Sequence, residues 1–233
     1  MTAKTVRPPI KIGALIPSHN EVYRLPFVLG ILLKVDGIDE IICVDDGSTD
    51  GTPDMLRRNY PNVKLVVLSP NRGKAGAVQA GAERTDCDYL LLIDADLQEL
   101  RSRDLEAGLR KLRTNAGIDM ILFVRTAELW WARLVRGHDL FSGERLIRRT
   151  DLLSIFNQSV VGYQLEVAIN QFMIDNKKRV VRMPLYCRSV LAAEKVGAEE
   201  GRRKERRMIR SILAYLGVRR FVQQFLWYPP TAN

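Results

Sequence analysis

Short apolar runs alternate with segments of helical periodicity through the first half of the chain. The apolar runs predict strands at residues 12–16, 40–44, 63–68, 88–93 and 120–124. The segments between them predict helices at residues 22–34, 53–59, 73–84 and 102–114. Continuous apolar strands that are separated by helices are typical of a parallel sheet covered on both faces. The pattern therefore predicts an α/β domain with a Rossmann-like, mostly parallel sheet.

The pattern becomes less regular after Val124. Residues 127–136 and 163–175 are expected to be helical, and residues 179–187 are expected to form a strand. From about Glu199, apolar residues recur at steps of three and four opposite a row of arginines, with Gly217 as a candidate break between two helices. We therefore expect one domain over residues 1–198 and a basic amphipathic helical tail over residues 199–233.

The positive charge of the chain is concentrated in this tail. Lysine and arginine number 36 against 27 aspartate and glutamate, a formal net charge of +9. Eight basic residues and one acidic residue lie between Arg202 and Arg220. Because the rest of the chain is nearly neutral, a uniformly basic nucleic-acid binder is not indicated, and no nucleic-acid partner is expected. Such a helix can lie on an anionic membrane surface, or it can pack on the domain or at a subunit interface.

The cysteines and the apolar runs indicate the compartment. Cys43, Cys87 and Cys187 lie far apart and form no CxxC pair, so we expect buried thiols in a reducing, intracellular environment. No run of about 18 apolar residues predicts a membrane span, and the first residues do not resemble a signal peptide. We therefore expect a cytoplasmic protein.

Polar clusters follow three of the predicted strands. The first strand leads into residues 17–21, the second into residues 45–51 and the fourth into residues 94–98. In open parallel sheets, ligands bind beyond the carboxyl ends of the strands. Clustered carboxylates repel one another unless a cation or hydrogen-bond donors lie among them. The three clusters therefore predict a binding site at this edge.

The third cluster, Asp-Ala-Asp-Leu-Gln, has the features of a metal site. Asp94, Asp96 and Gln98 carry side-chain oxygens at every second residue, which places them on one side of an extended backbone. Carboxylate and amide oxygens suit Mg²⁺ or Mn²⁺. The alternative is a polar turn that leads into the next helix.

Two further segments contain candidate ligand-binding residues. Asp45 and Asp46 could form an Asx-type turn, or a carboxylate there could accept hydrogen bonds from a base or a ribose. Lys74 follows small residues and could contact a phosphate, although the segment lacks the spacing of a Walker loop. No GxGxxG follows the first strand, which argues against a dinucleotide-dependent oxidoreductase. The two histidines have no matching serine or cysteine arrangement for a hydrolase triad.

Four motifs in this order and spacing carry a family resemblance: IPSHNE, VDDGSTDGT, NRGKAGAVQAG and LLIDADLQ. Together they resemble the nucleotide-sugar-binding half of family 2 glycosyltransferases, which have the GT-A fold. DADLQ in particular resembles the branch that acts on dolichyl or polyprenyl phosphates. The similarity covers roughly residues 10–115, with the acceptor half expected over residues 116–198.

The resemblance implies roles for individual residues on the donor side. It implies that the nucleoside of a UDP- or GDP-sugar is held by Pro17, His19, Glu21, Val44 and Asp46. Lys74 and Ala95 would lie near the sugar-nucleotide. Asp94, Asp96 and Gln98 would hold the metal that bridges the diphosphate, and Asp94 and Asp96 are therefore placed in the catalytic group.

The second half resembles the same family through two segments, FSGERLIRR from Phe141 and GYQLE from Gly162. Arg125, Arg145 and Arg148 are candidates to bind an acceptor phosphate, since guanidinium groups suit phosphate oxygens. Each could equally be a solvated surface residue. Glu144 and Arg145 are the remaining candidates for catalytic residues.

The resemblance implies a metal-dependent, inverting transfer of a sugar from a nucleoside diphosphate to a polyprenyl phosphate or a related lipid-linked acceptor. The first alternative is transfer to a sugar hydroxyl of a polysaccharide or glycolipid. Such an acceptor would need a general base, for which Asp139 and Glu144 are candidates, whereas a phosphate is already ionised. The second alternative is a catalytically silent membrane- or nucleic-acid-binding protein. We expect the protein on the inner face of the cell membrane, held peripherally by the tail.

Overall fold

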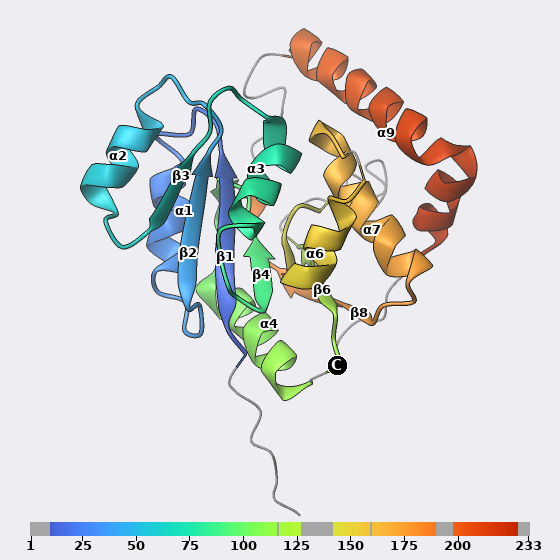
Figure 1. The fold of residues 1–233 in the computed structure, drawn as a ribbon, viewed down its shortest axis with the longest axis horizontal. Helices are drawn as coiled ribbons and strands as arrows, with labels where there is room; N and C mark the ends of the chain where they lie inside the picture. The colour runs from blue at the N-terminus through green and yellow to red at the C-terminus, as the bar shows by residue number, and fades with distance from the viewer. Residues whose placement is uncertain (1–9, 116, 127–141, 159, 190–197, 228–233) are drawn as a thin grey trace, which may run out of the picture.

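A seven-stranded sheet forms the centre of the molecule (Figure 1). The computed structural model describes residues 10–115, 117–126, 142–158, 160–189 and 198–227. In the spatial order β3-β2-β1-β4-β7-β6-β8, the strands are Lys64–Val67, Glu40–Asp45, Ile12–Ser18, Tyr89–Leu92, Arg145–Arg148, Met120–Arg125 and Val180–Leu185. A separate pair, β5 (Leu97–Gln98) and β9 (Arg188–Ser189), is antiparallel.

All strands of the large sheet except β7 run in the same direction. β1 pairs in parallel with β2 and β4, β2 pairs in parallel with β3, and β6 pairs in parallel with β8. β7 lies antiparallel between β4 and β6. The carboxyl ends of β1, β2, β4 and β6 therefore meet at one edge, together with the amino end of β7.

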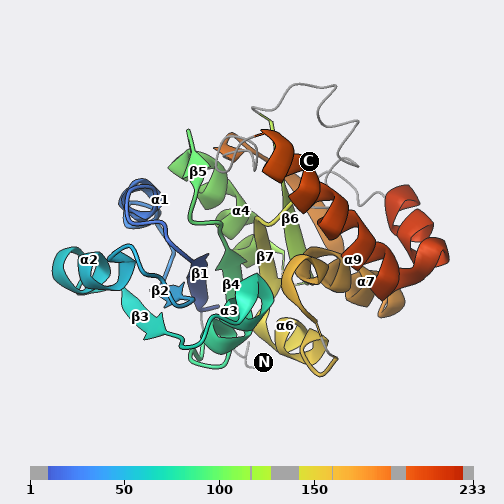
Figure 2. The same cartoon turned by 90° about the horizontal axis from the view of Figure 1, so that it is seen from above.

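Helices cover both faces of the sheet (Figure 2). On one face, α1 (Leu25–Leu32), α2 (Thr52–Asn59) and α4 (Ser102–Thr114) share a hydrophobic cluster with the strands. On the other, α3 (Gly73–Ala82), α6 (Arg149–Ile155) and α7 (Leu165–Asp175) share a second cluster. The predicted α/β class, with a mostly parallel sheet between two helical layers, is confirmed.

The predicted elements agree with these bounds in most places. α1 is shorter than expected, because Asn20 adopts a left-handed φ of 57° and Pro26 occupies the first turn of the helix. β7 and the β5–β9 pair were not predicted. The predicted helix at residues 127–136 lies outside the described residues, as does the candidate base Asp139.

The tail forms helix α9 (Ala198–Leu226), which is broken at Gly217 with φ 71° and ψ 160°, as the sequence suggested. Ile212 and Leu216 are buried against Val167 of α7. The apolar stripe expected to face a membrane is thus used in part to pack against the domain. No described helix is both long enough and apolar enough to cross a bilayer. The division of the chain at residue 198 stays a prediction.

Candidate active site at the carboxyl edge of the sheet

Three loops converge on Asp46, which follows the end of β2. His19, after β1, places Nδ1 2.9 Å from the backbone oxygen of Asp46. Asn71, before α3, donates from Nδ2 to the same oxygen at 2.8 Å. The backbone N–H of Arg72 donates to Oδ1 of Asp46 at 2.7 Å. The structure therefore brings together His19 and Asp46, two of the residues expected to hold the nucleoside.

Asp45 and Asp46 have different roles. Asp45 is fully buried, and its Oδ2 accepts a hydrogen bond from the backbone N–H of Ser48 at 3.1 Å. This contact is the Asx-type turn that was the alternative interpretation of the segment. Asp46 is the aspartate that contacts the neighbouring loops, so the turn and the site use adjacent residues.

The other residues expected to hold the nucleoside differ in their access to a ligand. Pro17 lines the same small cavity as Lys74 and Asp94. Glu21 is buried and forms an ion pair of 3.0 Å with Arg24. Val44 is fully buried, and its side chain faces α3, which is close enough that a Cβ at Gly81 would meet Val44 Cγ2 at 2.9 Å. A nucleoside contact by the side chain of Val44 is therefore excluded.

Lys74, at the start of α3, is the central cation of the site. Its Nζ lies 2.6 Å from Oδ1 of Asp94, which follows β4, and 2.8 Å from Oε1 of Glu166, at the start of α7. Burial by itself would lower the pKa of Lys74, but the two carboxylates outweigh burial and raise its pKa. Lys74 is therefore a fixed positive charge that joins two acidic groups.

Gly143 lies directly against this ion pair. A Cβ added there would come within 2.8 Å of Lys74 Nζ and 2.9 Å of Asp94 Oδ2. Only glycine allows the backbone this close an approach without displacing the two charged groups. The sequence offered Gly143 only as part of the segment FSGERLIRR, without a role of its own.

Arg125 and Glu144 form a bidentate pair beside Asp94. Arg125 Nε lies 2.9 Å from Glu144 Oε2, and Arg125 Nη2 lies 2.7 Å from Glu144 Oε1. Ser142 Oγ also donates to Glu144 Oε2, at 3.0 Å. Arg125 Nη2 lies 3.7 Å from Asp94 Oδ2. Burial would lower the pKa of Arg125, but Glu144 and then Asp94 outweigh it and raise the pKa.

The proposed roles of Glu144 and Arg145 in catalysis are not supported by their surroundings. Glu144 is fully buried, with both carboxylate oxygens engaged by Arg125. Arg145 is also fully buried; it donates to the backbone oxygen of Ser142 at 2.9 Å and to Oδ1 of Asn170 at 2.7 Å. Burial lowers the pKa of Arg145 to about 10. Both side chains hold elements together, although Arg145 also lines the small cavity that contains Lys74 and Asp94.

Arg148 lies away from the site. It pairs in register with Tyr89, at the amino end of β4, whereas Arg145 pairs with Leu92 at the carboxyl end. Arg148 forms an ion pair of 3.5 Å with Asp119, and its guanidinium lies 5.0 Å from the ring centroid of Tyr89. The expectation that Arg148 binds an acceptor is therefore wrong, because three residues of strand separate it from the carboxyl edge.

The expected metal ligands fit a divalent ion in part. Asp94 and Asp96 are both half-buried, so their carboxylates provide hard oxygen donors that a ligand can reach. Gln98 Oε1 accepts a hydrogen bond from Arg188 Nη2 at 2.9 Å, which uses one of its two lone pairs. Ala95, between the two aspartates, is buried. Within the described segments, no group of three or more acidic, histidine or cysteine side chains is arranged around a metal position.

Comparison with known proteins agrees with this arrangement. Residues 14–172 match the family described as glycosyl transferase family 2. Dolichyl-phosphate beta-glucosyltransferase of Dictyostelium discoideum is 34% identical over 37% of this chain and 31% of its own length. Undecaprenyl-phosphate 4-deoxy-4-formamido-L-arabinose transferase of Pseudomonas syringae is 38% identical over 39% of this chain and 29% of its own. The chain thus aligns with about a third of these relatives' length.

A solved structure is similar to this chain over more of its length than the sequence relatives are. Glucosyl-3-phosphoglycerate synthase of Mycobacterium tuberculosis, in complex with Mn²⁺, UDP-glucose and phosphoglyceric acid, superposes with a TM-score of 0.66. The superposition covers 88% of this chain and 79% of that one at 19% identity, which supports the fold alone. The α/β architecture is accordingly the GT-A fold. With the family matched over most of its length, the chain belongs to glycosyl transferase family 2.

Proposed function

We propose that the protein transfers a sugar from a nucleoside-diphosphate sugar to a polyprenyl phosphate, or to a related lipid-linked acceptor, with inversion at the anomeric carbon. The observation that carries the proposal is the ion pair between Lys74 and Asp94, with Asp96 two residues further on, at the carboxyl edge of a family 2 domain. The relatives named for dolichyl and undecaprenyl phosphates support the acceptor class.

On the donor side, the loops around Asp46 form the wall for the base and the ribose, and Lys74 lies where a diphosphate would meet the carboxylates. A divalent ion held by Asp94 and Asp96 would neutralise the charge that develops on the leaving diphosphate. Lys74 supplies a positive charge close to the same position. Donor binding in this arrangement gathers positive charge around the bond that breaks.

On the acceptor side, the state of Glu144 favours a phosphate over a hydroxyl. A hydroxyl must lose a proton as it attacks, so its transfer calls for a general base near the sugar. Glu144 is fully buried and paired with Arg125 through both oxygens, so its carboxylate is neither exposed to an acceptor nor free of its cation. A phosphate monoester is ionised near neutral pH and attacks without a base. We therefore rank the lipid phosphate above the sugar hydroxyl.

The location that fits this acceptor is the inner surface of the cell membrane. The first part of α9 carries exposed arginines, and Val218, Val222 and Leu226 are exposed apolar residues of its second part. Cationic and apolar side chains on one helix suit the headgroup region of an anionic bilayer. We propose peripheral attachment through α9, with Mg²⁺ or Mn²⁺ as the ion and UDP or GDP as the nucleotide of the donor.

The test is product formation with paired acceptors and paired variants. Nucleoside-diphosphate sugars are incubated with Mn²⁺ and either undecaprenyl phosphate in detergent micelles or free sugars, and the lipid-extractable and water-soluble products are measured. We expect a lipid-linked sugar with the wild type, none with Asp96→Ala, and wild-type amounts with Asp86→Ala, which removes an exposed aspartate away from the site. If sugar is transferred only to the free sugars, the acceptor group is a hydroxyl and the proposed lipid phosphate is wrong.

A further inference from the structure

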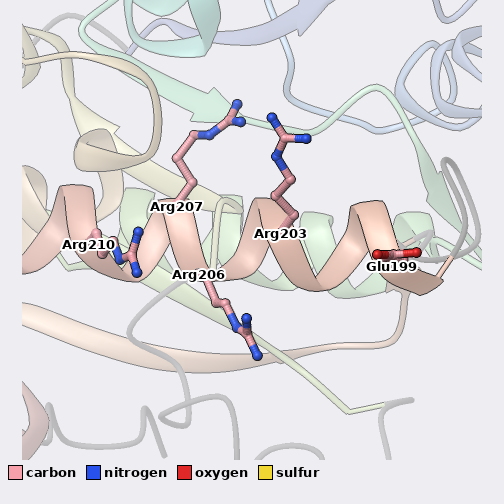
Figure 3. Close-up of a pocket in the computed structure, with 5 residues that line it drawn as sticks. All are labelled: Glu199, Arg203, Arg206, Arg207 and Arg210. Atoms are coloured by element: carbon pink, nitrogen blue, oxygen red, sulfur yellow. The ribbon is translucent and has the colours of Figure 1, made fainter.

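A cavity lies on α9, outside the ion-pair site. It has a volume of about 520 Å³ and is lined by Glu199, Arg203, Arg206, Arg207 and Arg210 (Figure 3). All four guanidinium groups belong to exposed residues. A concave surface with four cations and one acid favours a ligand that carries several negative oxygens.

The position of these arginines on the helix is fixed by packing on its opposite side. Residues 203, 206, 207 and 210 follow the spacing of one helical stripe. The stripe on the other side contains Met208, Ile212 and Leu216, which pack with Val167 of α7. The domain therefore holds α9 by its apolar side and leaves the arginine side open.

The arginine stripe is tied to the ion-pair site through the start of α7. Gln164, the last residue of the 3₁₀ helix η2 (Gly162–Gln164), donates from Nε2 to Ser211 Oγ of α9 at 3.1 Å. Two residues later, Glu166 contacts Lys74 at 2.8 Å. Ser211 follows Arg207 by about one helical turn. One short segment thus contacts both the central cation and the helix that carries the arginines.

The figures place the stripe at the same end of the molecule as the site. The first turns of α9 lie at the end where the parallel strands terminate (Figures 1 and 2). Arg203 and Arg207 extend together from one side of the helix, and Arg206 extends to the other side (Figure 3). Arg203 and Arg207 therefore form a pair on one side of α9.

None of the arginines first expected to bind an acceptor phosphate is an exposed cation at the carboxyl edge. Arg125 is mostly buried and held by Glu144, Arg145 is fully buried, and Arg148 lies at the opposite edge of the sheet. An exposed cation that meets an acceptor phosphate from solvent must therefore come from another element. The stripe on α9 supplies exposed guanidinium groups at that end of the molecule.

We propose that Arg203 and Arg207, with Arg206 and Arg210 beside them, form the subsite for the phosphate of the acceptor. The proposal rests on the function proposed above, since it names the group that recognises the same acceptor. Two guanidinium groups one turn apart can each donate two parallel hydrogen bonds to phosphate oxygens. The subsite is thus built by the carboxyl-terminal helix rather than by the strands that hold the donor.

The test measures binding to neutral phosphatidylcholine vesicles that contain a small fraction of either undecaprenyl phosphate or phosphatidylglycerol at equal charge. The variants are Arg203→Gln/Arg207→Gln and, as a charge-matched control, Lys34→Gln/Arg58→Gln, whose residues are exposed and lie outside both the cavity and α9. We expect the first variant to lose at least about tenfold in affinity for undecaprenyl phosphate vesicles, and to lose clearly less for phosphatidylglycerol vesicles, where only the general attraction to an anionic surface is weakened. The control should bind both like the wild type.

Three results would overturn the subsite, and they differ from one another. If the arginine variant binds undecaprenyl phosphate vesicles like the wild type, the phosphate is bound elsewhere. If it loses affinity for both kinds of vesicle to the same extent, the stripe is a general contact with anionic membranes. If the wild type does not prefer undecaprenyl phosphate, the acceptor of the proposed function fails and the subsite fails with it. Thermal unfolding of each variant confirms that the helix is intact.

Discussion

The ammonium of Lys74 lies 2.6 Å from Oδ1 of Asp94, so the cation that begins α3 is held by the carboxylate that follows β4. The same ammonium lies 2.8 Å from Glu166. Two carboxylates on one ammonium leave a net negative charge, which repels a diphosphate. A divalent cation at Asp94 and Asp96 would bring the sum of these charges, with Asp96 included, to zero. Binding of metal and binding of nucleotide are therefore expected to be coupled through Lys74.

Replacement of Lys74 tests this coupling. Lys74→Gln removes the positive charge and leaves Asp94 and Glu166 without it, so repulsion of a diphosphate increases. We expect the affinity for UDP or GDP in the presence of Mn²⁺ to fall at least about tenfold, measured by titration calorimetry. Lys64→Gln is the matched control, because Lys64 forms an exposed ion pair with Glu40 far from the site. Equal affinities in the two variants would contradict a role for Lys74.

Gly143→Ala tests the close approach of the backbone to the ion pair. The new methyl group would meet Lys74 Nζ at 2.8 Å and Asp94 Oδ2 at 2.9 Å, so the ion pair must move. Because the ends of these side chains can shift, the melting temperature should change little while nucleotide affinity falls several-fold. Gly30→Ala in α1 is the control, since a Cβ there meets nothing within 4 Å. Unchanged nucleotide affinity in Gly143→Ala would show that the ion pair is not part of the donor site.

The packing of α9 on the domain predicts a difference between two isoleucines of one helix. Ile212 is 1% exposed and Ile209 is 48% exposed. Ile212→Ala is expected to lower the free energy of unfolding by about 2–5 kcal/mol, because it opens a cavity beside Val167. Ile209→Ala is expected to stay within about 0.5 kcal/mol of the wild type. Denaturant titration measures both values, and equal values would mean that α9 is not docked on α7.

The thiols predict how reactivity depends on pH. Cys43, Cys87 and Cys187 are free and buried. Burial, with a smaller contribution from Asp45, raises the pKa of Cys43 to about 12. A raised pKa means less thiolate at a given pH, so reaction of the folded protein with a disulfide reagent should stay slow from about pH 7 to pH 9. The unfolded protein should react fully at the same pH. Rapid reaction of all three thiols in the folded protein would contradict their burial.

The sequence identified the parallel strands because most of them are nearly continuous apolar runs. β7 was missed for a physical reason. Its four residues, Arg-Leu-Ile-Arg, have a charged residue at each end and too few apolar positions to show a period. Only the pairing of β7 with β4 and β6 makes a strand of them. The antiparallel strand within a parallel sheet therefore depends on tertiary contacts.

Tertiary contacts also decide part of the site, and the sequence could not predict that part. Asp94 and Asp46 could be placed because each follows a strand whose end is readable in the sequence, and the family resemblance gave Asp46 and Lys74 their expected roles. The partners of the arginines could not, since Arg125 meets Glu144 only through the pairing of β6 with β7. Arg145 is a charged residue at a strand end, yet Asn170 and the backbone of Ser142 allow its complete burial. Glu166 likewise joins Lys74 only after α7 packs near α3.

The most direct test of the account is calorimetric binding of UDP and of GDP, each with and without Mn²⁺, to the wild type and to Asp96→Ala. We expect one of the two nucleotides to bind the wild type tightly only when Mn²⁺ is present, and Asp96→Ala to lose this metal-dependent binding while remaining folded. The nucleotide that binds would identify the base of the donor. If neither nucleotide binds the wild type in the presence of Mn²⁺, or if Asp96→Ala binds equally well, the donor site proposed at Lys74, Asp94 and Asp96 is wrong.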